Sequence, residues 1–175
     1  MGLMPISVLL SFMSKKDQKI IPNRYHVVPR TLIFILHDEE ILLLKGAENK
    51  KIWAGYYNGV GGHIERGESV IDAAKRELLE ETGINTDLKL KSIIFIDVEE
   101  NLGINLFVFV GQIMNNQIES GPEGELEWVN LSAIKNYPLV EDLYELIPKI
   151  LSQGDKILYG NYSYHKEKLT MSFSD

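Results

Sequence analysis

Apolar residues recur with two different periods along this chain, and the changes of period divide it into strands and helices. Apolar runs bounded by turn residues predict two β-hairpins, at residues 31–46 and 157–173, which turn at HDEE and HKEK. Two more strands are expected at 88–98 and 104–114, joined by the turn-like EENLG, and a strand end followed by a short turn at 127–134.

Two other segments repeat their apolar residues at helical spacing. The first begins at Ser69, where Asp72 completes a variant of the capping box, and Gly83 is placed to end it in a left-handed conformation. The second lies at 139–151 and has an apolar stripe along one side. Strands, helix, strands, helix and strands, in this order, predict a mixed α/β domain with helices packed on sheets.

Residues 47–68 separate the first hairpin from the first helix and show no periodicity. They read AENKKIWAGYYNGVGGHIERGE and are rich in glycine, asparagine and charge. We expect a long surface loop here, and loops of this length inside a compact domain are usually functional.

Composition narrows the class of protein. The formal net charge of -7 argues against a broad surface for nucleic acid or anionic membranes, but it leaves room for a small phosphorylated ligand. The absence of cysteine excludes disulfides and thiolate catalysis and makes the cytoplasm the default location. Since MPISVLLSFM is too short to span a bilayer, we expect residues 1–23 to be an N-terminal extension of one domain at 24–175.

The first helix carries three glutamates, Glu77, Glu80 and Glu81, at the margin of its apolar stripe. Like charges this close repel one another by a few tenths of a kcal/mol per exposed pair. One interpretation is a solvated acidic stripe with Lys75 and Arg76 as partners. The other is a site for a hard divalent cation such as Mg²⁺, which prefers carboxylate and carbonyl oxygens.

The spacing around these glutamates is specific. Gly62 is followed by five residues and Glu68, then by seven residues and Arg76-Glu77-Leu78, and after one more residue by Glu80-Glu81. Gly83-Ile84 closes the pattern, which covers 23 positions. The pattern resembles the Nudix box, the signature of the Nudix hydrolase superfamily, and lies in the predicted loop and helix that this motif requires.

The resemblance implies an α/β/α sandwich with a mixed sheet and a C-terminal β-hairpin. It also implies an enzyme that uses Mg²⁺ or Mn²⁺ to hydrolyse a nucleoside diphosphate linked to another group. By motif position, the metal-binding groups are the carbonyl of Gly62 and the carboxylates of Glu77, Glu80 and Glu81. Arg76 would orient Glu77, and Glu68 would brace the loop against the helix. Metal ions in such sites align the pyrophosphate and activate a water.

Other residues bear on the substrate. Asn58 is similar to an asparagine of the Nudix triphosphatases that remove oxidised purine nucleotides; alternatively, it is a turn residue ahead of Gly59. The predicted C-terminal hairpin also resembles the tail of that subgroup. Glu141 and Asp142 lie where that subgroup contacts the base; alternatively, they form the exposed first turn of the second helix. The remaining candidates for substrate contact are Gly61 and Lys45, the latter alternatively a solvated charge.

A further carboxylate for the metal is expected just before the strand at 127–134. Glu123 is our choice and Glu125 the alternative, although either is equally well explained as a surface residue. Trp53, Tyr56 and Tyr57 would line a base pocket or belong to the core.

The leading functional hypothesis is a nucleoside triphosphate pyrophosphohydrolase that yields the monophosphate and pyrophosphate. The alternatives are a Nudix enzyme for ADP-ribose, a dinucleoside polyphosphate or another nucleotide conjugate, and a non-catalytic Nudix module that senses nucleotides. We expect a small-molecule nucleotide as partner, no nucleic acid polymer, no membrane, and a monomer or homodimer.

Overall fold

The computed structural model describes residues 24–48, 53–118, 124–166 and 168–174, so the expectation for residues 1–23 lies outside the described residues. The strands are β1 (His26–His37), β2 (Glu40–Gly46), β3 (Tyr57–Asn58), β4 (Leu88–Glu99), β5 (Leu102–Gln112), β6 (Gly124–Asn130), β7 (Leu158–His165) and β8 (Lys168–Ser174). The helices are α1 (Val70–Thr82) and α2 (Leu143–Ser152), with a short 3-10 turn at Ile134–Asn136 between β6 and α2.

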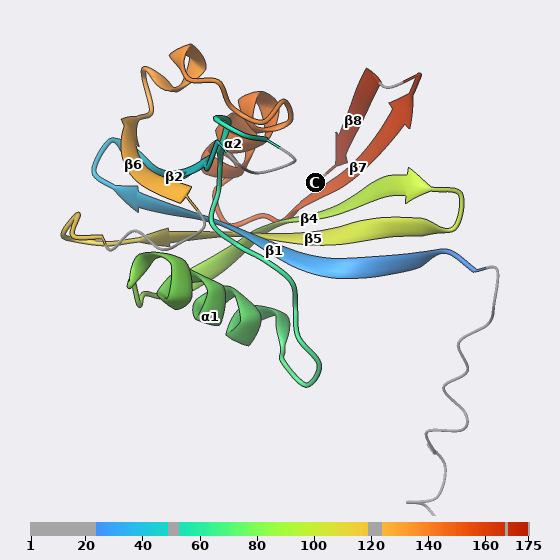
Figure 1. The fold of residues 1–175 in the computed structure, drawn as a ribbon, viewed down its shortest axis with the longest axis horizontal. Helices are drawn as coiled ribbons and strands as arrows, with labels where there is room; N and C mark the ends of the chain where they lie inside the picture. Colours follow the sequence, from blue (N-terminus) through green and yellow to red (C-terminus); the bar gives the residue numbers. More distant parts are fainter. Residues whose placement is uncertain (1–23, 49–52, 119–123, 167, 175) are drawn as a thin grey trace, which may run out of the picture.

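One mixed sheet organises the described part of the chain. Its strand order is β3-β2-β1-β5-β4-β7-β8, and β6 pairs with β2 off this path. The pairs β1 with β5 and β4 with β7 are parallel, whereas the hairpin partners β1 with β2, β4 with β5 and β7 with β8 are antiparallel. Figure 1 shows α1 on one side of the sheet and α2 on the other. The predicted α/β fold with a mixed sheet and a C-terminal hairpin is confirmed.

Each helix covers its own hydrophobic core. Helix α1 packs Ala74 and Leu78 against Ile33 and Phe109 of the sheet, while α2 packs Leu143 and Leu146 with others against the opposite face. The predicted caps of α1 are present: the Ser69 hydroxyl accepts the Asp72 N–H, and Gly83 has φ 71°. In the described part of the chain, no helix combines the length and apolarity needed to cross a membrane.

Helix α2 begins later than its apolar stripe suggested. It starts at Leu143 rather than Leu139. The reason lies in the backbone, because Val140 donates its N–H to the Tyr57 carbonyl at 3.0 Å, and Leu139 forms a parallel bridge with Tyr57. These two residues are therefore extended and belong to the edge of the sheet.

The predicted long loop is held against the free edge of β1. The Ile33 N–H donates to the Val60 carbonyl at 2.7 Å, and the Thr31 N–H donates to the Gly62 carbonyl at 2.9 Å. At Gly61, φ is 149° and an added Cβ would lie 2.2 Å from the Thr31 carbonyl oxygen. Only glycine tolerates both conditions, so Gly61 allows the loop to approach the strand closely enough for these hydrogen bonds.

Candidate active site

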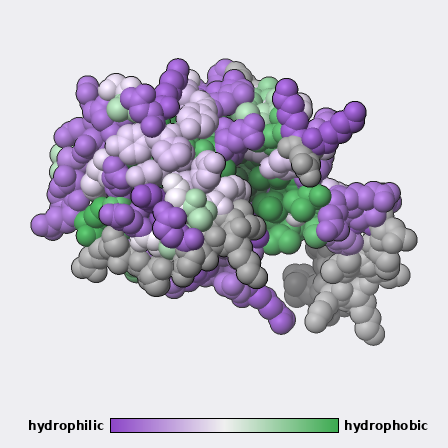
Figure 2. Space-filling model, turned by 45° about the horizontal axis from the view of Figure 1, so that its top comes forward, coloured by the Kyte–Doolittle hydropathy of each residue, from purple (hydrophilic) through white to green (hydrophobic). Residues whose placement is uncertain are grey.

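A large cavity lies beside the sheet, between the glycine loop, the start of α2 and the C-terminal hairpin. Its volume is about 730 Å³, within the range for small-molecule sites. Its wall is apolar where β1, β4 and β5 contribute Leu32, Ile96, Ile104 and Leu106. Figure 2 shows a hollow with a hydrophobic floor and a hydrophilic rim on this face. The two ends of the cavity differ in chemistry. We call the end with Glu77 and Glu81 the acidic end, and the end with Asn58, Glu141 and Asp142 the base end.

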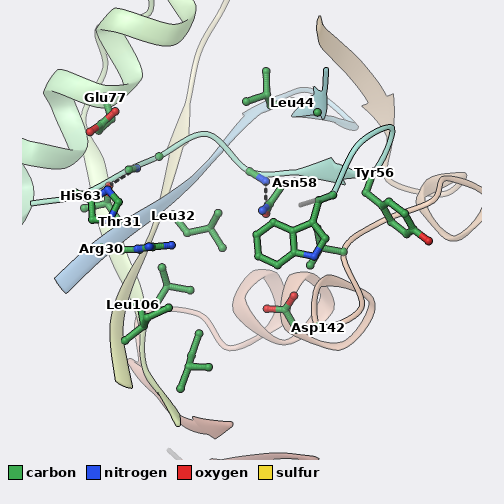
Figure 3. A pocket seen from close by; sticks show the side chains of 18 of the residues that line it. Arg30, Thr31, Leu32, Leu44, Tyr56, Asn58, His63, Glu77, Leu106 and Asp142 are labelled. Atoms are coloured by element: carbon green, nitrogen blue, oxygen red, sulfur yellow. Dashed lines mark hydrogen bonds between the residues drawn. The ribbon is translucent and has the colours of Figure 1, made fainter. Parts of the chain in front are cut away.

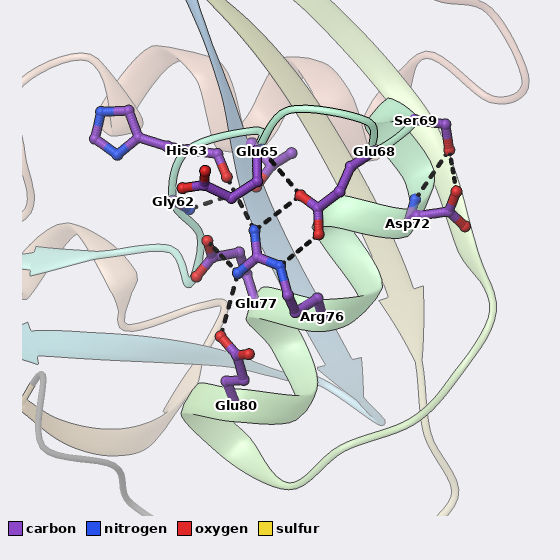
Figure 4. A network of polar contacts seen from close by, with 10 residues as sticks. Gly62, His63, Glu65, Glu68, Ser69, Asp72, Arg76, Glu77 and Glu80 are labelled. Atoms are coloured by element: carbon purple, nitrogen blue, oxygen red, sulfur yellow. Dashed lines mark hydrogen bonds and ion pairs between the residues drawn. The ribbon is translucent and has the colours of Figure 1, made fainter.

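The acidic end is organised by Arg76 of α1 (Figure 4). Its Nε and Nη2 donate to the two carboxylate oxygens of Glu68 at 2.7 and 3.1 Å, a bidentate pair. Its Nη1 donates to Glu77 at 2.8 Å and to Glu80 at 3.2 Å, and Nη2 also reaches the His63 carbonyl at 3.1 Å. A guanidinium has about five N–H donors, so these contacts use its full capacity.

Glu68 links this network back to the loop. Its second oxygen also accepts the backbone N–H of Glu65 at 2.9 Å. The hydrogen bonds from Arg76, together with the one from Glu65, lower the pKa of Glu68. The loop and the helix are therefore joined by one carboxylate that stays ionised.

Gly62 brings the loop into contact with the helix. A Cβ added to it would lie 2.4 Å from Oε1 of Glu77, so no larger residue fits between the loop and this carboxylate. The Gly62 carbonyl accepts the Thr31 N–H. Since a carbonyl oxygen has about two lone pairs, one remains for a second partner.

The three glutamates of the motif have different surroundings. Glu77 and Glu81 line the cavity; the Glu77 side chain is 14% exposed and Glu81 is 8% exposed. Glu80, with its side chain 60% exposed, lies outside the cavity lining and pairs with Arg76. The helix thus directs two carboxylates inward and one toward its outer edge.

The donor chemistry at the acidic end fits a hard divalent cation. Two carboxylates and the glycine-loop backbone meet there, and such cations bind carboxylate and carbonyl oxygens. Among the residues that the structure describes, no set of three or more His, Asp or Glu side chains stands close enough together to hold one ion. Glu123 lies outside the described residues, and Glu125 lines a different recess.

The base end contains the two acidic residues that precede α2. Asp142 is half-buried, and its carboxylate points into the cavity (Figure 3). Burial, with a smaller contribution from the neighbouring charge of Glu141, raises the pKa of Asp142 to about 6. Glu141 also lines the cavity but is exposed. Neither residue lies within the helix, and Asp142 makes no capping hydrogen bond with its side chain.

Asn58 takes part in a turn and in the cavity at once. Its Oδ1 accepts the Gly59 N–H at 2.8 Å, and the residue lines the cavity together with Trp53, Tyr56 and Gly61. Both interpretations of Asn58 from the sequence are therefore compatible with its position.

Lys45 lies away from this cavity. It lines a separate recess of about 310 Å³ with Glu48 and Glu125, whereas its neighbours Leu44 and Gly46 line the large cavity.

A hydrogen-bond network fixes the base end to the sheet. Glu127 of β6 accepts the hydroxyls of Tyr57 at 2.5 Å and Tyr137 at 3.0 Å. Burial and this hydrogen bond raise the pKa of Tyr57 to about 12. The backbone of Tyr57 bonds on both sides to the segment before Glu141, through Pro138 and Val140. Tyr57 is thus a core residue that holds β3, and with it Asn58, beside Glu141 and Asp142.

Several polar residues of the cavity were not among those expected from the sequence, including Arg30 of β1 and Tyr162 of β7. Tyr162 is 1% exposed, and its hydroxyl has no hydrogen-bond partner in the described structure. Strand alternation is a signal for both residues, but the pairing of β1 with β5 and of β4 with β7 was needed to show that their faces meet.

Comparisons with known proteins agree with this site. Residues 27–150 match the family model of the NUDIX domain. The chain is 29% identical over 146 residues to an oxidized purine nucleoside triphosphate hydrolase of Mus musculus, covering 82% of this chain and 91% of that protein. It is also 29% identical over 142 residues to an uncharacterised Nudix hydrolase of Bacillus subtilis, covering 78% and 86%.

The fold has solved counterparts as well. A MutT protein from Bacillus halodurans superimposes with a TM-score of 0.72 at 26% identity, covering 84% of this chain and 97% of the other. Members of this family use divalent cations and act on small nucleotides. The fold, the spacing of the box and the matched family model show together that this chain belongs to the Nudix hydrolases.

Proposed function

We propose that the protein is a Mg²⁺- or Mn²⁺-dependent nucleoside triphosphate pyrophosphohydrolase that prefers oxidised purines and yields the monophosphate and pyrophosphate. One observation carries the proposal. The same cavity holds the inward carboxylates Glu77 and Glu81 at one end and Asn58, Glu141 and Asp142 at the other. A nucleotide can therefore place its phosphates and its base at chemically matched ends.

At the acidic end, Glu77 and Glu81 would hold the cation, with Glu80 as a third carboxylate and the Gly62 carbonyl as a backbone ligand. When bound, the cation neutralises polyphosphate charge and lowers the pKa of a water molecule. The residues of the chain fix the geometry. Arg76 holds Glu77 through a hydrogen bond of 2.8 Å, and its bidentate pair with Glu68 anchors the loop.

At the base end, Asp142 supplies the discrimination. Oxidation at the eight position of a purine converts the neighbouring ring nitrogen from an acceptor to a donor. The carboxylate of Asp142, ionised at neutral pH because its pKa is about 6, accepts that hydrogen bond. An ordinary purine presents a lone pair instead, and an unpaired buried acceptor costs roughly 1–3 kcal/mol. The mouse relative is named as a hydrolase of oxidised purine nucleoside triphosphates, which supports this assignment.

A panel of nucleotides and nucleotide conjugates with Mg²⁺ tests the proposal, with pyrophosphate and phosphate release measured separately. We expect pyrophosphate release, fastest with oxidised purine triphosphates. Faster hydrolysis of ADP-ribose or a dinucleoside polyphosphate would establish another Nudix activity, and binding without hydrolysis would indicate a sensor module. We further propose that the enzyme works in the cytoplasm as a monomer or homodimer, without a nucleic acid polymer as partner.

A further inference from the structure

We propose that Arg30 is a phosphate-binding residue that holds the polyphosphate of the nucleotide midway along the cavity. The proposal deepens the proposed function and rests on a nucleotide occupying this cavity. Arg30 lies on β1, outside the Nudix motif, and was not among the residues expected from the sequence.

The surroundings of Arg30 leave its charge without a protein partner. Among the residues that the structure describes, no carboxylate lies within ion-pair distance of its guanidinium, and its buried Nε has no hydrogen-bond partner. Burying a cation is costly unless it is paired. Arg76 shows the contrast, because all its donors are used within the protein. The donors of Arg30 are therefore available for an external anion.

Arg30 is positioned between the two ends of the cavity. Its backbone forms a bridge with His63, next to Gly62 at the acidic end, and its Cα lies opposite Leu106 of the apolar wall. In the view of Figure 3, Arg30 reaches into the cavity between Glu77 and Asp142. If the reactive phosphate lies at Glu77 and the base at Asp142, the rest of the phosphate chain passes Arg30.

Charge favours phosphate over other ligands for this guanidinium. Of the described residues that line the cavity, Arg30 is the only arginine or lysine, whereas five are acidic: Glu65, Glu77, Glu81, Glu141 and Asp142. A polyphosphate would be repelled by such a cavity without a compensating cation. The planar fork of a guanidinium matches two phosphate oxygens at once.

Calorimetry with inorganic tripolyphosphate in excess Mg²⁺ tests the proposal, since this probe has the phosphates and no base. Arg30→Gln should weaken tripolyphosphate binding about 10- to 100-fold, equivalent to about 1.4–2.8 kcal/mol. Arg66→Gln, an exposed arginine outside the cavity lining, is the matched control and should bind as the wild type does. Arg30→Lys keeps the charge without the fork and should lie between them.

Several outcomes would overturn the assignment: no binding of tripolyphosphate to the wild type, equal binding by Arg30→Gln, or an equal loss in Arg66→Gln. A loss of guanosine binding as large as the loss of tripolyphosphate binding would mean that Arg30 stacks on the base instead. If Arg30→Gln does not fold, Arg30→Lys still decides between fork and charge. Because tripolyphosphate lacks a base, the result stands even if the nucleotide panel reveals a substrate other than purine triphosphates.

Discussion

The two ends of the cavity are built in opposite ways. The acidic end comes from one continuous stretch, residues 62–81, in which a loop folds back on the helix that follows it. The base end is assembled from β3, the segment before α2 and β7, which lie far apart in the sequence. The difference shows that the acidic end is encoded locally, whereas the base end depends on the tertiary fold.

The ends also differ in how their polar groups are satisfied. At the acidic end, Arg76 makes its hydrogen bonds to Glu68, Glu77, Glu80 and His63 within the protein. Toward the base end, the buried Tyr162 hydroxyl has no hydrogen-bond partner in the described structure. Buried polar groups in proteins are nearly always hydrogen-bonded, so an unmet group in a cavity marks a place for ligand or water. The Arg76 network is therefore preorganised, whereas the Tyr162 hydroxyl is completed by what binds.

The largest effect is expected at the acidic end. Glu81→Gln and Glu80→Gln should each lower turnover by a factor of at least about a hundred, because each removes a carboxylate proposed to hold the metal. Folding should be preserved, since removing one of several mutually repelling charges costs little stability. Steady-state kinetics and thermal melting measure the two effects. Glu99→Gln, at the exposed end of β4, is the control. A variant that unfolds readily yet keeps its specific activity would show that the glutamate is structural.

Metal should stabilise the acidic end and with it the whole fold. An ion that binds only the native state adds about 2.7 kcal/mol at a hundredfold excess over Kd. Melting temperatures should therefore rise with millimolar Mg²⁺ or Mn²⁺. The triple Gln variant at Glu77, Glu80 and Glu81 should lose this rise, and an undiminished rise would place the ion elsewhere.

The base end should control selectivity without controlling rate. Asp142→Ala or Glu141→Ala should reduce a preference of about ten- to a hundredfold in kcat/KM for oxidised over ordinary purine triphosphates. Metal-dependent turnover of the ordinary substrate should change little. Glu145→Ala, an exposed residue of α2 outside the cavity lining, is the matched control. A preference that survives both substitutions would locate base recognition around Trp53 and Tyr56 instead.

The smallest effect concerns pH. Because the pKa of Asp142 is raised to about 6 in the folded protein, the native state binds this proton more tightly than the unfolded chain. The contribution of Asp142 to the free energy of unfolding is thus full below about pH 4 and is lost progressively as the pH rises through about 6. Denaturant unfolding should show the stability of Asp142→Asn, relative to wild type, rising across this range. The preference for oxidised purines should weaken below pH 6, where the carboxyl becomes protonated. A pH-independent difference in stability would contradict the burial of this side chain.

The sequence was most informative where structure depends on neighbours in the chain. The caps of α1 at Ser69 and Gly83 and the spacing of the motif are local patterns, and hairpins follow from adjacent apolar runs. Arg30 and Tyr162 could not be placed, because their position depends on the parallel pairing of distant strands. Lys45 was assigned to substrate contact from its place near the loop, but it lines a separate recess in the structure.

The parallel bridge between Tyr57 and Leu139 bears on how such an enzyme changes its specificity. The Tyr57 N–H donates to the Pro138 carbonyl, and the Tyr57 carbonyl accepts the Val140 N–H. Asn58 and Asp142 are therefore held at a spacing set by main-chain register. A slip of one residue would break both bonds and turn the side chains away. Specificity for a different nucleobase would therefore arise more readily by exchanging the side chains at positions 58 and 142 than by inserting or deleting residues near them. This holds for divergent evolution and for protein engineering alike.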